Sequence, residues 1–282
     1  MKKIILSLFA ALGCSASMMA QTDDNVLRIN FIGTGTPIEN EHILEGVHIT
    51  FNDDGDKMNL TVNNATVTYD LNNVLDMSHF NGDPQVNLHA NEDPTIGEEG
   101  KYYTTFYSRL EAYSLPEGVK AYTAEISENT VLLTPIEGDI LPQGEAVLLY
   151  TTEGSEITMV VADGTGVNKS ENNKFSGVDV ETEQYSPNYI LSYGQDGLGF
   201  YRMNEDMMLS ANKAFLPAAD PAMANIRAFR MVFEDEETGI ENINDDDTLR
   251  YDNDNIYSVS GIRLNKFQKG INIVNGKKII VK

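Results

Sequence analysis

The chain has 282 residues, of which 41% are hydrophobic, and this is enough for one large domain or two to three small ones. The formal net charge is -23, from 43 Asp and Glu against 20 Lys and Arg. This charge argues against nucleic acid and anionic membrane surfaces as partners, since both are bound through clustered Lys and Arg.

The N-terminus is predicted to be a secretory signal peptide over residues 1–20. A charged pair, Lys2-Lys3, precedes an apolar run, and Ala20 offers a small residue at a cut before Gln21. Lipidation at Cys14, the only cysteine of the chain, is the alternative. The mature chain is expected to be secreted, to an extracellular location or the outer-membrane surface, with no disulfide, thiolate nucleophile or cysteine metal site.

Residues 22–90 are predicted to form a small β module with a faint internal repeat. One copy runs over residues 27–51 and the other over residues 58–80, and each opens with a period-two strand and closes on a strand that ends in Phe. Residues 52–56, with the sequence Asn-Asp-Asp-Gly-Asp, predict a hairpin turn between the copies. Residues 81–100 are rich in Gly and Pro and predict a linker or a long loop.

Residues 100–234 are predicted to form the main domain, an antiparallel β-sandwich or barrel. Short runs rich in Tyr, Phe, Ile and Leu alternate with turn signals about every ten residues. The segment Gly194-Gln195-Asp196-Gly197 predicts a hairpin, and residues 221–228 predict at most a short helical turn. The fold class expected for the whole chain is therefore all-β.

Two C-terminal segments follow. Residues 235–255 are acidic and polar and predict a flexible linker, since they cannot bury enough apolar surface to order themselves. Residues 256–282 predict a short β tail, with Asn275-Gly276 between apolar runs as a type I′ hairpin signal.

Three segments carry resemblances. Residues 47–51, 54–55 and 69–71 resemble a small β module found near the N-termini of secreted, surface-associated bacterial proteins. The order of motifs from Leu115-Pro116 to Phe215-Leu216 is similar to an accessory β domain of such proteins that has no agreed activity. The tail resembles the end of a type IX secretion C-terminal sorting domain, which implies the secretion machinery as a partner. The residues that carry this last resemblance include Gly261, Arg263, Gly270, Gly276, Lys278 and Lys282.

The tail also departs from that sorting family, because Asn272 stands where the family usually has Tyr and only about 27 residues match. A shortened relative with another anchoring role is the alternative.

The sequence predicts no catalytic, cofactor-binding or metal site. The four histidines lie in the first module without the spacing of a helical metal pair, although His48 and His79 occupy matching repeat positions. A Ser–His–Asp site would have to bridge two modules. Oxygen-rich segments at residues 52–56 and 245–254 lack the spacing of a calcium-binding EF-hand loop.

Carbohydrate chemistry stays open, because acids are abundant and tyrosines can replace the missing Trp as sugar platforms. The tyrosines considered for this are Tyr102, Tyr103, Tyr107, Tyr113 and Tyr201. We therefore expect a non-enzymatic, exported binding, adhesion or accessory protein whose partner is a host or matrix protein or a glycan. The alternative is a carbohydrate-binding or glycan-acting protein that uses Tyr and Asp/Glu of the middle domain.

Overall fold

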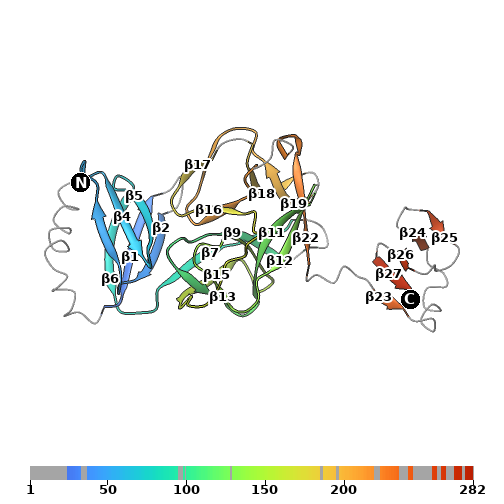
Figure 1. Ribbon diagram of the computed structural model, residues 1–282, viewed down its shortest axis with the longest axis horizontal. Helices are drawn as coiled ribbons and strands as arrows, with labels where there is room; N and C mark the ends of the chain where they lie inside the picture. Colours follow the sequence, from blue (N-terminus) through green and yellow to red (C-terminus); the bar gives the residue numbers. More distant parts are fainter. Residues whose placement is uncertain are drawn as a thin grey trace. The chain divides into compact units, whose positions relative to one another are not determined.

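The protein is all-β, as the sequence predicts: strand accounts for 59% and helix for 1% of the residues described in the computed structural model (Figure 1). The chain divides into two compact units, residues 1–232 and 233–282. The predicted leader, residues 1–20 with Cys14, lies outside the described residues. Those are residues 24–32, 37–94, 98, 100–127, 129–184, 187–194, 197–218, 223–234, 241–243, 256–258, 262–264, 270–274 and 277–281.

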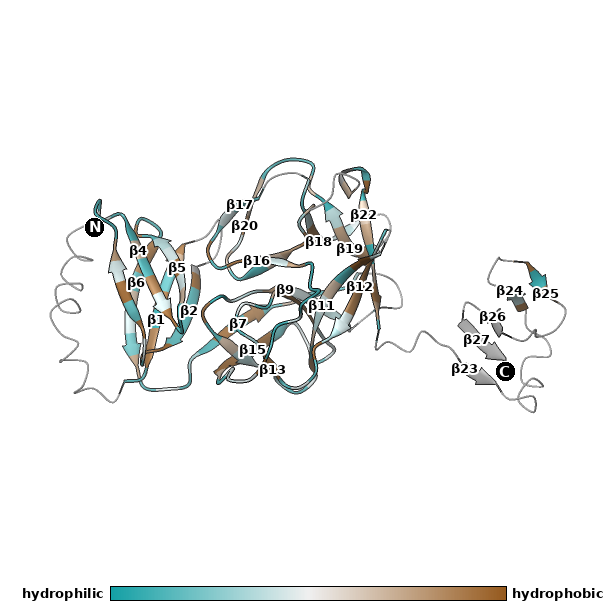
Figure 2. Cartoon of the chain, viewed as in Figure 1, coloured by the Kyte–Doolittle hydropathy of each residue, from teal (hydrophilic) through white to brown (hydrophobic). Residues whose placement is uncertain are grey.

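The first part of the larger unit is a sandwich of two antiparallel three-stranded sheets, which we call the first sandwich. Alternate apolar residues of its strands are buried, for example Leu27, Ile29 and Phe31, and they belong to one core. Hydrophobic and hydrophilic residues alternate along these strands (Figure 2). One sheet has the order β2-β1-β6 and the other β3-β4-β5. The strands are β1 (Val26–Ile32), β2 (Pro37–Ile43), β3 (His48–Phe51), β4 (Lys57–Val62), β5 (Ala65–Asp70) and β6 (Val74–Phe80).

The two copies of the predicted repeat interleave in this sandwich. Strand β1 of the first copy pairs with β6 of the second, and β3 of the first copy pairs with β4 of the second. The predicted turn at residues 52–56 joins β3 to β4, and Gly55 has a φ of 67°, a backbone conformation that glycine adopts at no steric cost. His48 and His79 therefore lie on different sheets, β3 and β6.

The rest of this unit contains a large curled sheet that forms a half-barrel. Its order is β18-β19-β22-β12-β11-β14-β9-β8. The strands are β8 (Asn91–Glu92), β9 (Tyr102–Phe106), β11 (Val119–Ser127), β12 (Thr130–Pro135), β14 (Val147–Thr151), β18 (Tyr189–Gly194), β19 (Gly197–Arg202) and β22 (Ala228–Phe233).

A four-stranded sheet of order β13-β10-β15-β7 packs against the half-barrel, and Phe106, Val147 and Leu149 of the large sheet share a core with Val86 and Leu88 of β7. Two strand pairs, β16–β21 and β17–β20, complete this part. The bounds are β7 (Gln85–His89), β10 (Ala112–Ser114), β13 (Ile140–Leu141), β15 (Glu156–Ala162), β16 (Ser176–Val178), β17 (Thr182–Gln184), β20 (Met207–Leu209), β21 (Lys213–Phe215) and the 3₁₀ turn η2 (Met223–Asn225).

The interpretation of residues 81–100 as a linker or loop is wrong, since they contain β7 and β8. Val86 and Leu88 alternate into the core, and β7 pairs along its length with β15. The hairpin predicted at residues 194–197 is confirmed, because Gly194 and Gly197 are partners in the β18–β19 register.

The smaller unit contains a five-stranded sheet of order β23-β27-β26-β24-β25. The predicted hairpin is confirmed, because Val274 pairs with Lys277 around residues 275–276. The acidic segment 235–255 is not linker throughout: β23 pairs in parallel with β27. The bounds are β23 (Glu241–Ile243), β24 (Ile256–Ser258), β25 (Arg263–Leu264), β26 (Gly270–Val274) and β27 (Lys277–Val281).

Candidate functional site

Residues 108–111, which connect β9 to β10, join the second part of the larger unit to the first sandwich, and we call them the junction loop. Leu110 is only 2% exposed, and it belongs to the core of the first sandwich together with Ala211. When an apolar side chain enters the core of a neighbouring sandwich, apolar surface of the side chain and of that core is removed from water. Leu110 is thus the apolar anchor of the junction.

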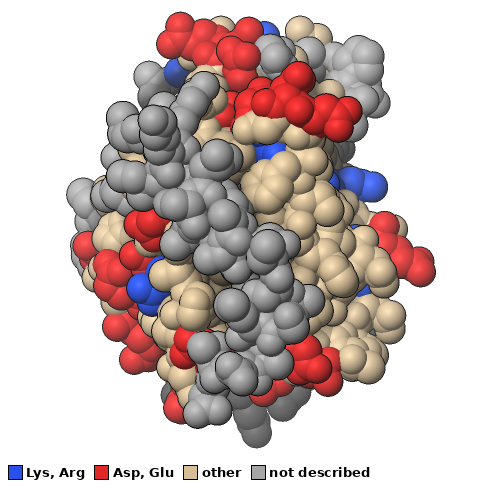
Figure 3. Space-filling model, turned by 90° about the vertical axis from the view of Figure 1, so that its left-hand side faces the viewer, with Lys and Arg blue, Asp and Glu red and all other residues tan. Residues whose placement is uncertain are grey.

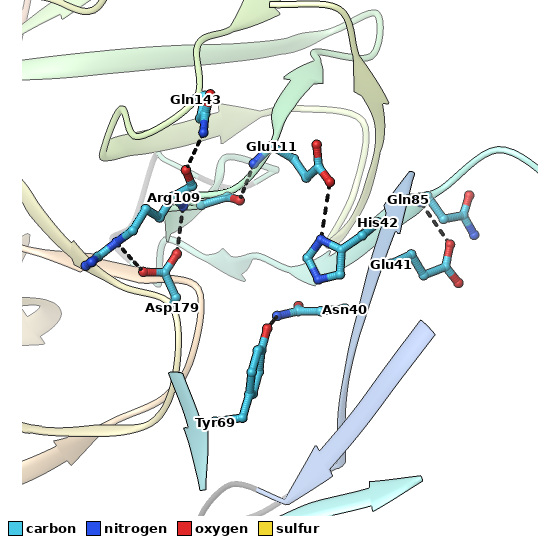
Figure 4. A network of polar contacts seen from close by, with 10 residues as sticks. Asn40, Glu41, His42, Tyr69, Gln85, Arg109, Glu111, Gln143 and Asp179 are labelled. Atoms are coloured by element: carbon cyan, nitrogen blue, oxygen red, sulfur yellow. Dashed lines mark hydrogen bonds and ion pairs between the residues drawn. The ribbon is translucent and has the colours of Figure 1, made fainter. Parts of the chain in front are cut away.

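On one side of Leu110, Arg109 holds Asp179. The backbone N–H of Arg109 donates to Oδ1 of Asp179 at 2.6 Å, and Nε of Arg109 donates to Oδ2 at 3.1 Å (Figure 4). Gln143 donates to the carbonyl of Arg109 at 2.9 Å. Burial raises the pKa of Asp179, although the hydrogen bonds and charge of Arg109 act in the opposite direction.

On the other side of Leu110, Glu111 contacts His42 of β2. Nδ1 of His42 lies 3.3 Å from Oε1 of Glu111, and each residue is 3% exposed (Figure 4). The backbone N–H of Glu111 donates to Oγ of Ser108 at 3.3 Å. This contact joins the two parts, and a carboxylate–imidazole pair of this composition also occurs in catalytic triads.

A catalytic triad would also need a hydroxyl group on the other imidazole nitrogen. Nε2 of His42 is buried and has no hydrogen-bond partner among the described residues. A general base needs the proton it abstracts within about 2.6–3.2 Å, directly or through one water. The described residues therefore show a buried imidazole–carboxylate pair, and none of their hydroxyl groups is hydrogen-bonded to Nε2 of His42.

Glu41, on the same strand, is the third junction contact. Its Oε1 accepts from Nη2 of Arg28 at 2.6 Å, and its Oε2 accepts from the backbone N–H of Gln85 at 2.9 Å. Gln85 opens β7, so Glu41 ties β2 to the four-stranded sheet. Beside it, Asn40 lies 3.5 Å from the hydroxyl of Tyr69, whose pKa burial raises.

Sequence reasoning missed this junction. His42 was grouped with the histidines of the first module, but it is buried. The other three histidines are exposed; His79 lies 2.6 Å from Asp24 and His89 lies 2.8 Å from Glu156. Among the described residues, no group of three or more His, Cys, Asp and Glu could hold a metal ion.

A second candidate site is an open pocket of about 580 Å³ beside Tyr201 of β19, which we call the Tyr201 pocket. The hydroxyl of Tyr201 donates to the carbonyl of Gly197 at 2.7 Å. A Cβ built on Gly194 would lie 2.3 Å from the ring, so the ring lies against the glycine backbone. Because glycine has no side chain, the aromatic ring can approach the backbone closely at this position.

Charged and apolar residues line the remainder of the Tyr201 pocket. Tyr193 is 53% exposed at its rim. Arg202 and Arg227 contribute exposed guanidinium groups, and the backbone N–H of Arg202 donates to the carbonyl of Arg227 at 3.0 Å, which joins the two segments. Glu205 lines the same pocket.

The tyrosines considered from sequence do not converge. Tyr103 is 4% exposed and packs on Tyr150, with ring centroids 5.1 Å apart. Tyr113 is also 4% exposed and packs on Phe106 at 5.3 Å. Of the five, Tyr102 and Tyr107 are half-buried outside the pocket, and Tyr201 lines it. Tyr193, Arg202 and Arg227 are pocket residues that the sequence reasoning did not select.

The residues of the predicted sorting tail lie partly in the described sheet. Arg263 is in β25 opposite Tyr257, Gly270 opens β26, and Lys278 is in β27. The other three, Gly261, Gly276 and Lys282, lie outside the described residues.

No protein-family model, curated protein or solved structure matches this chain. No helix in the described part of the chain has the length and apolar character needed to span a membrane.

Proposed function

We propose that the protein is an exported, non-enzymatic β protein that binds a ligand at the cell surface or outside the cell, and that the Tyr201 pocket takes a glycan. The observation that carries this proposal is the ring of Tyr201, held against Gly194 next to an open pocket. Sugars present an apolar face of C–H groups, and a fixed aromatic ring removes that face from water with little loss of side-chain freedom.

The acids support binding over hydrolysis. Glycosidases use two carboxyl groups that flank the scissile bond at a set separation. Among the described residues that line the pocket, Glu205 is the one carboxylate. Figure 3 shows a surface on which Asp and Glu predominate over Lys and Arg, which supports a partner other than nucleic acid.

The test of glycan binding uses the full mature chain on a glycan array, followed by calorimetry on the hits. We expect Tyr201→Ala to weaken binding about tenfold or more, which corresponds to roughly 1.4 kcal/mol. Tyr201→Phe keeps the ring and should retain most of the affinity. Tyr257→Ala, in the smaller unit, is the matched control. The proposal is contradicted if the chain binds no glycan, or if the Tyr201→Ala variant binds the glycan as tightly as the wild type does.

The tail supports a surface location through its resemblance to a sorting domain. Fractionation of cells that express the full chain, or the chain without residues 256–282, tests this. We expect the full chain to reach the cell surface and the shortened chain to be retained inside the cell envelope without reaching the surface. Mature chain in the cytosol would refute the export proposal.

A further inference from the structure

The cations of the Tyr201 pocket indicate the class of glycan. The chain has 43 Asp and Glu and only 20 Lys and Arg, yet two arginines line this single pocket. The hydrogen bond from the backbone of Arg202 to that of Arg227 holds their segments together at 3.0 Å. Both side chains are exposed, so neither guanidinium carries a burial cost.

Arginine is the side chain best matched to a carboxylate, because its planar fork donates two parallel hydrogen bonds. Arg202 directly follows Tyr201 in β19, and both residues line the pocket. Asn204 and Asn225 also line the pocket, and their amides can donate to and accept from hydroxyl groups. Aromatic ring, carboxylate-binding fork and amide groups together match a sugar that bears an acid.

We propose that the Tyr201 pocket binds a saccharide that carries a carboxylate, with Arg202 and Arg227 on the acid and the ring of Tyr201 on the apolar face of the sugar. This inference rests on the proposed glycan-binding function. Glu205 and the net charge of -23 oppose densely charged polyanions, so we expect preference for one or a few carboxylates over sulfated chains.

Calorimetry with the full mature chain tests the inference on matched probes: oligogalacturonate and its methyl ester, sialyllactose and lactose, and a sulfated disaccharide. We expect at least one carboxylated probe to bind at least tenfold more tightly than its ester or neutral counterpart. Arg202→Gln and Arg227→Gln should remove most of that difference. Arg202→Lys should recover it only in part, since an ammonium lacks the fork.

Two controls keep the outcomes separate. The melting temperature of each variant, measured beside that of the wild type, separates loss of binding from loss of folding. Arg230→Gln, an exposed arginine of β22 outside the pocket, should leave binding unchanged. Equal binding of acid and neutral probes, with loss of both in Tyr201→Ala, overturns this inference and leaves the glycan site standing. Preference for the sulfated probe, or acid binding that survives both Gln substitutions, also overturns it. Failure of every glycan to bind refutes the proposed function itself.

Discussion

Replacement of Leu110 by Ala is expected to destabilise the larger unit by about 2–5 kcal/mol, the range for Leu→Ala substitutions in cores. Leu110 is 2% exposed, so nearly all of the removed surface is buried. Loss of roughly three methylene-sized groups at about 0.8 kcal/mol each accounts for about 2.4 kcal/mol. The rest depends on how far the core of the first sandwich closes around the cavity.

Urea and thermal unfolding of the full chain, followed by far-ultraviolet circular dichroism and tyrosine fluorescence, measure this effect. For a unit of this size each kcal/mol lowers the melting temperature by roughly 2–4 °C, so we expect a decrease of about 4–20 °C. Leu75→Ala is the matched control, because Leu75 lies on β6 of the same sandwich and is 45% exposed. Its effect should stay within about 0.5 kcal/mol. An equally small effect of Leu110→Ala would refute the role of the junction loop as an anchor.

Three further predictions concern buried charge and glycine. Burial raises the pKa of Asp179 above 3.8. The unfolding free energy of the wild type relative to Asp179→Asn should therefore be greatest below about pH 3.8 and should decrease as the pH rises through the raised pKa. Urea unfolding from pH 3 to 7 checks this, and a difference that stays constant with pH contradicts it. Burial lowers the pKa of Lys213 below 10.5, so Lys213→Met should be at least as stable as the wild type at pH 7, with an advantage that shrinks as the pH approaches 10.5. Urea unfolding from pH 7 to 10.5 checks this, and an advantage that does not shrink contradicts it. A Cβ on Gly199 would lie 2.7 Å from the carbonyl oxygen of Phe229, so Gly199→Ala should lower the melting temperature, and an unchanged transition would show that the strands separate at little cost.

The strands were predictable wherever one face is buried over several residues. In β4 the pattern Met58, Leu60, Val62 alternates with polar residues, and each of the three is buried. The β18–β19 hairpin followed from its glycines. By contrast, the sequence predicts a loop where the structure has β7. Val86 and Leu88 stand in a segment rich in Gly and Pro, and a period of two over five residues is too short to outweigh those signals.

The junction was not predictable from periodicity, since its residues come from segments far apart in the chain. Leu110 is a single apolar residue between Arg109 and Glu111, and such a pattern is typical of a surface loop. Its flanking residues find partners 70 and 69 residues away, at Asp179 and His42. Only tertiary packing brings these four polar residues together and buries three of them, His42, Glu111 and Asp179.

The chemistry of the junction explains how a chain with a single cysteine can hold two β structures in one arrangement. An apolar contact such as that of Leu110 stabilises but does not specify geometry, because many apolar packings have similar free energies. Buried polar pairs behave in the opposite way, since they add little net stability but impose a large penalty on any arrangement that leaves them unpaired. We therefore infer that Leu110 supplies the stability of the junction, and that Glu41, Glu111 and Asp179 select its orientation. On this basis Glu111→Gln should cost less stability than Leu110→Ala, while it should increase amide hydrogen exchange in β2 more than in β4.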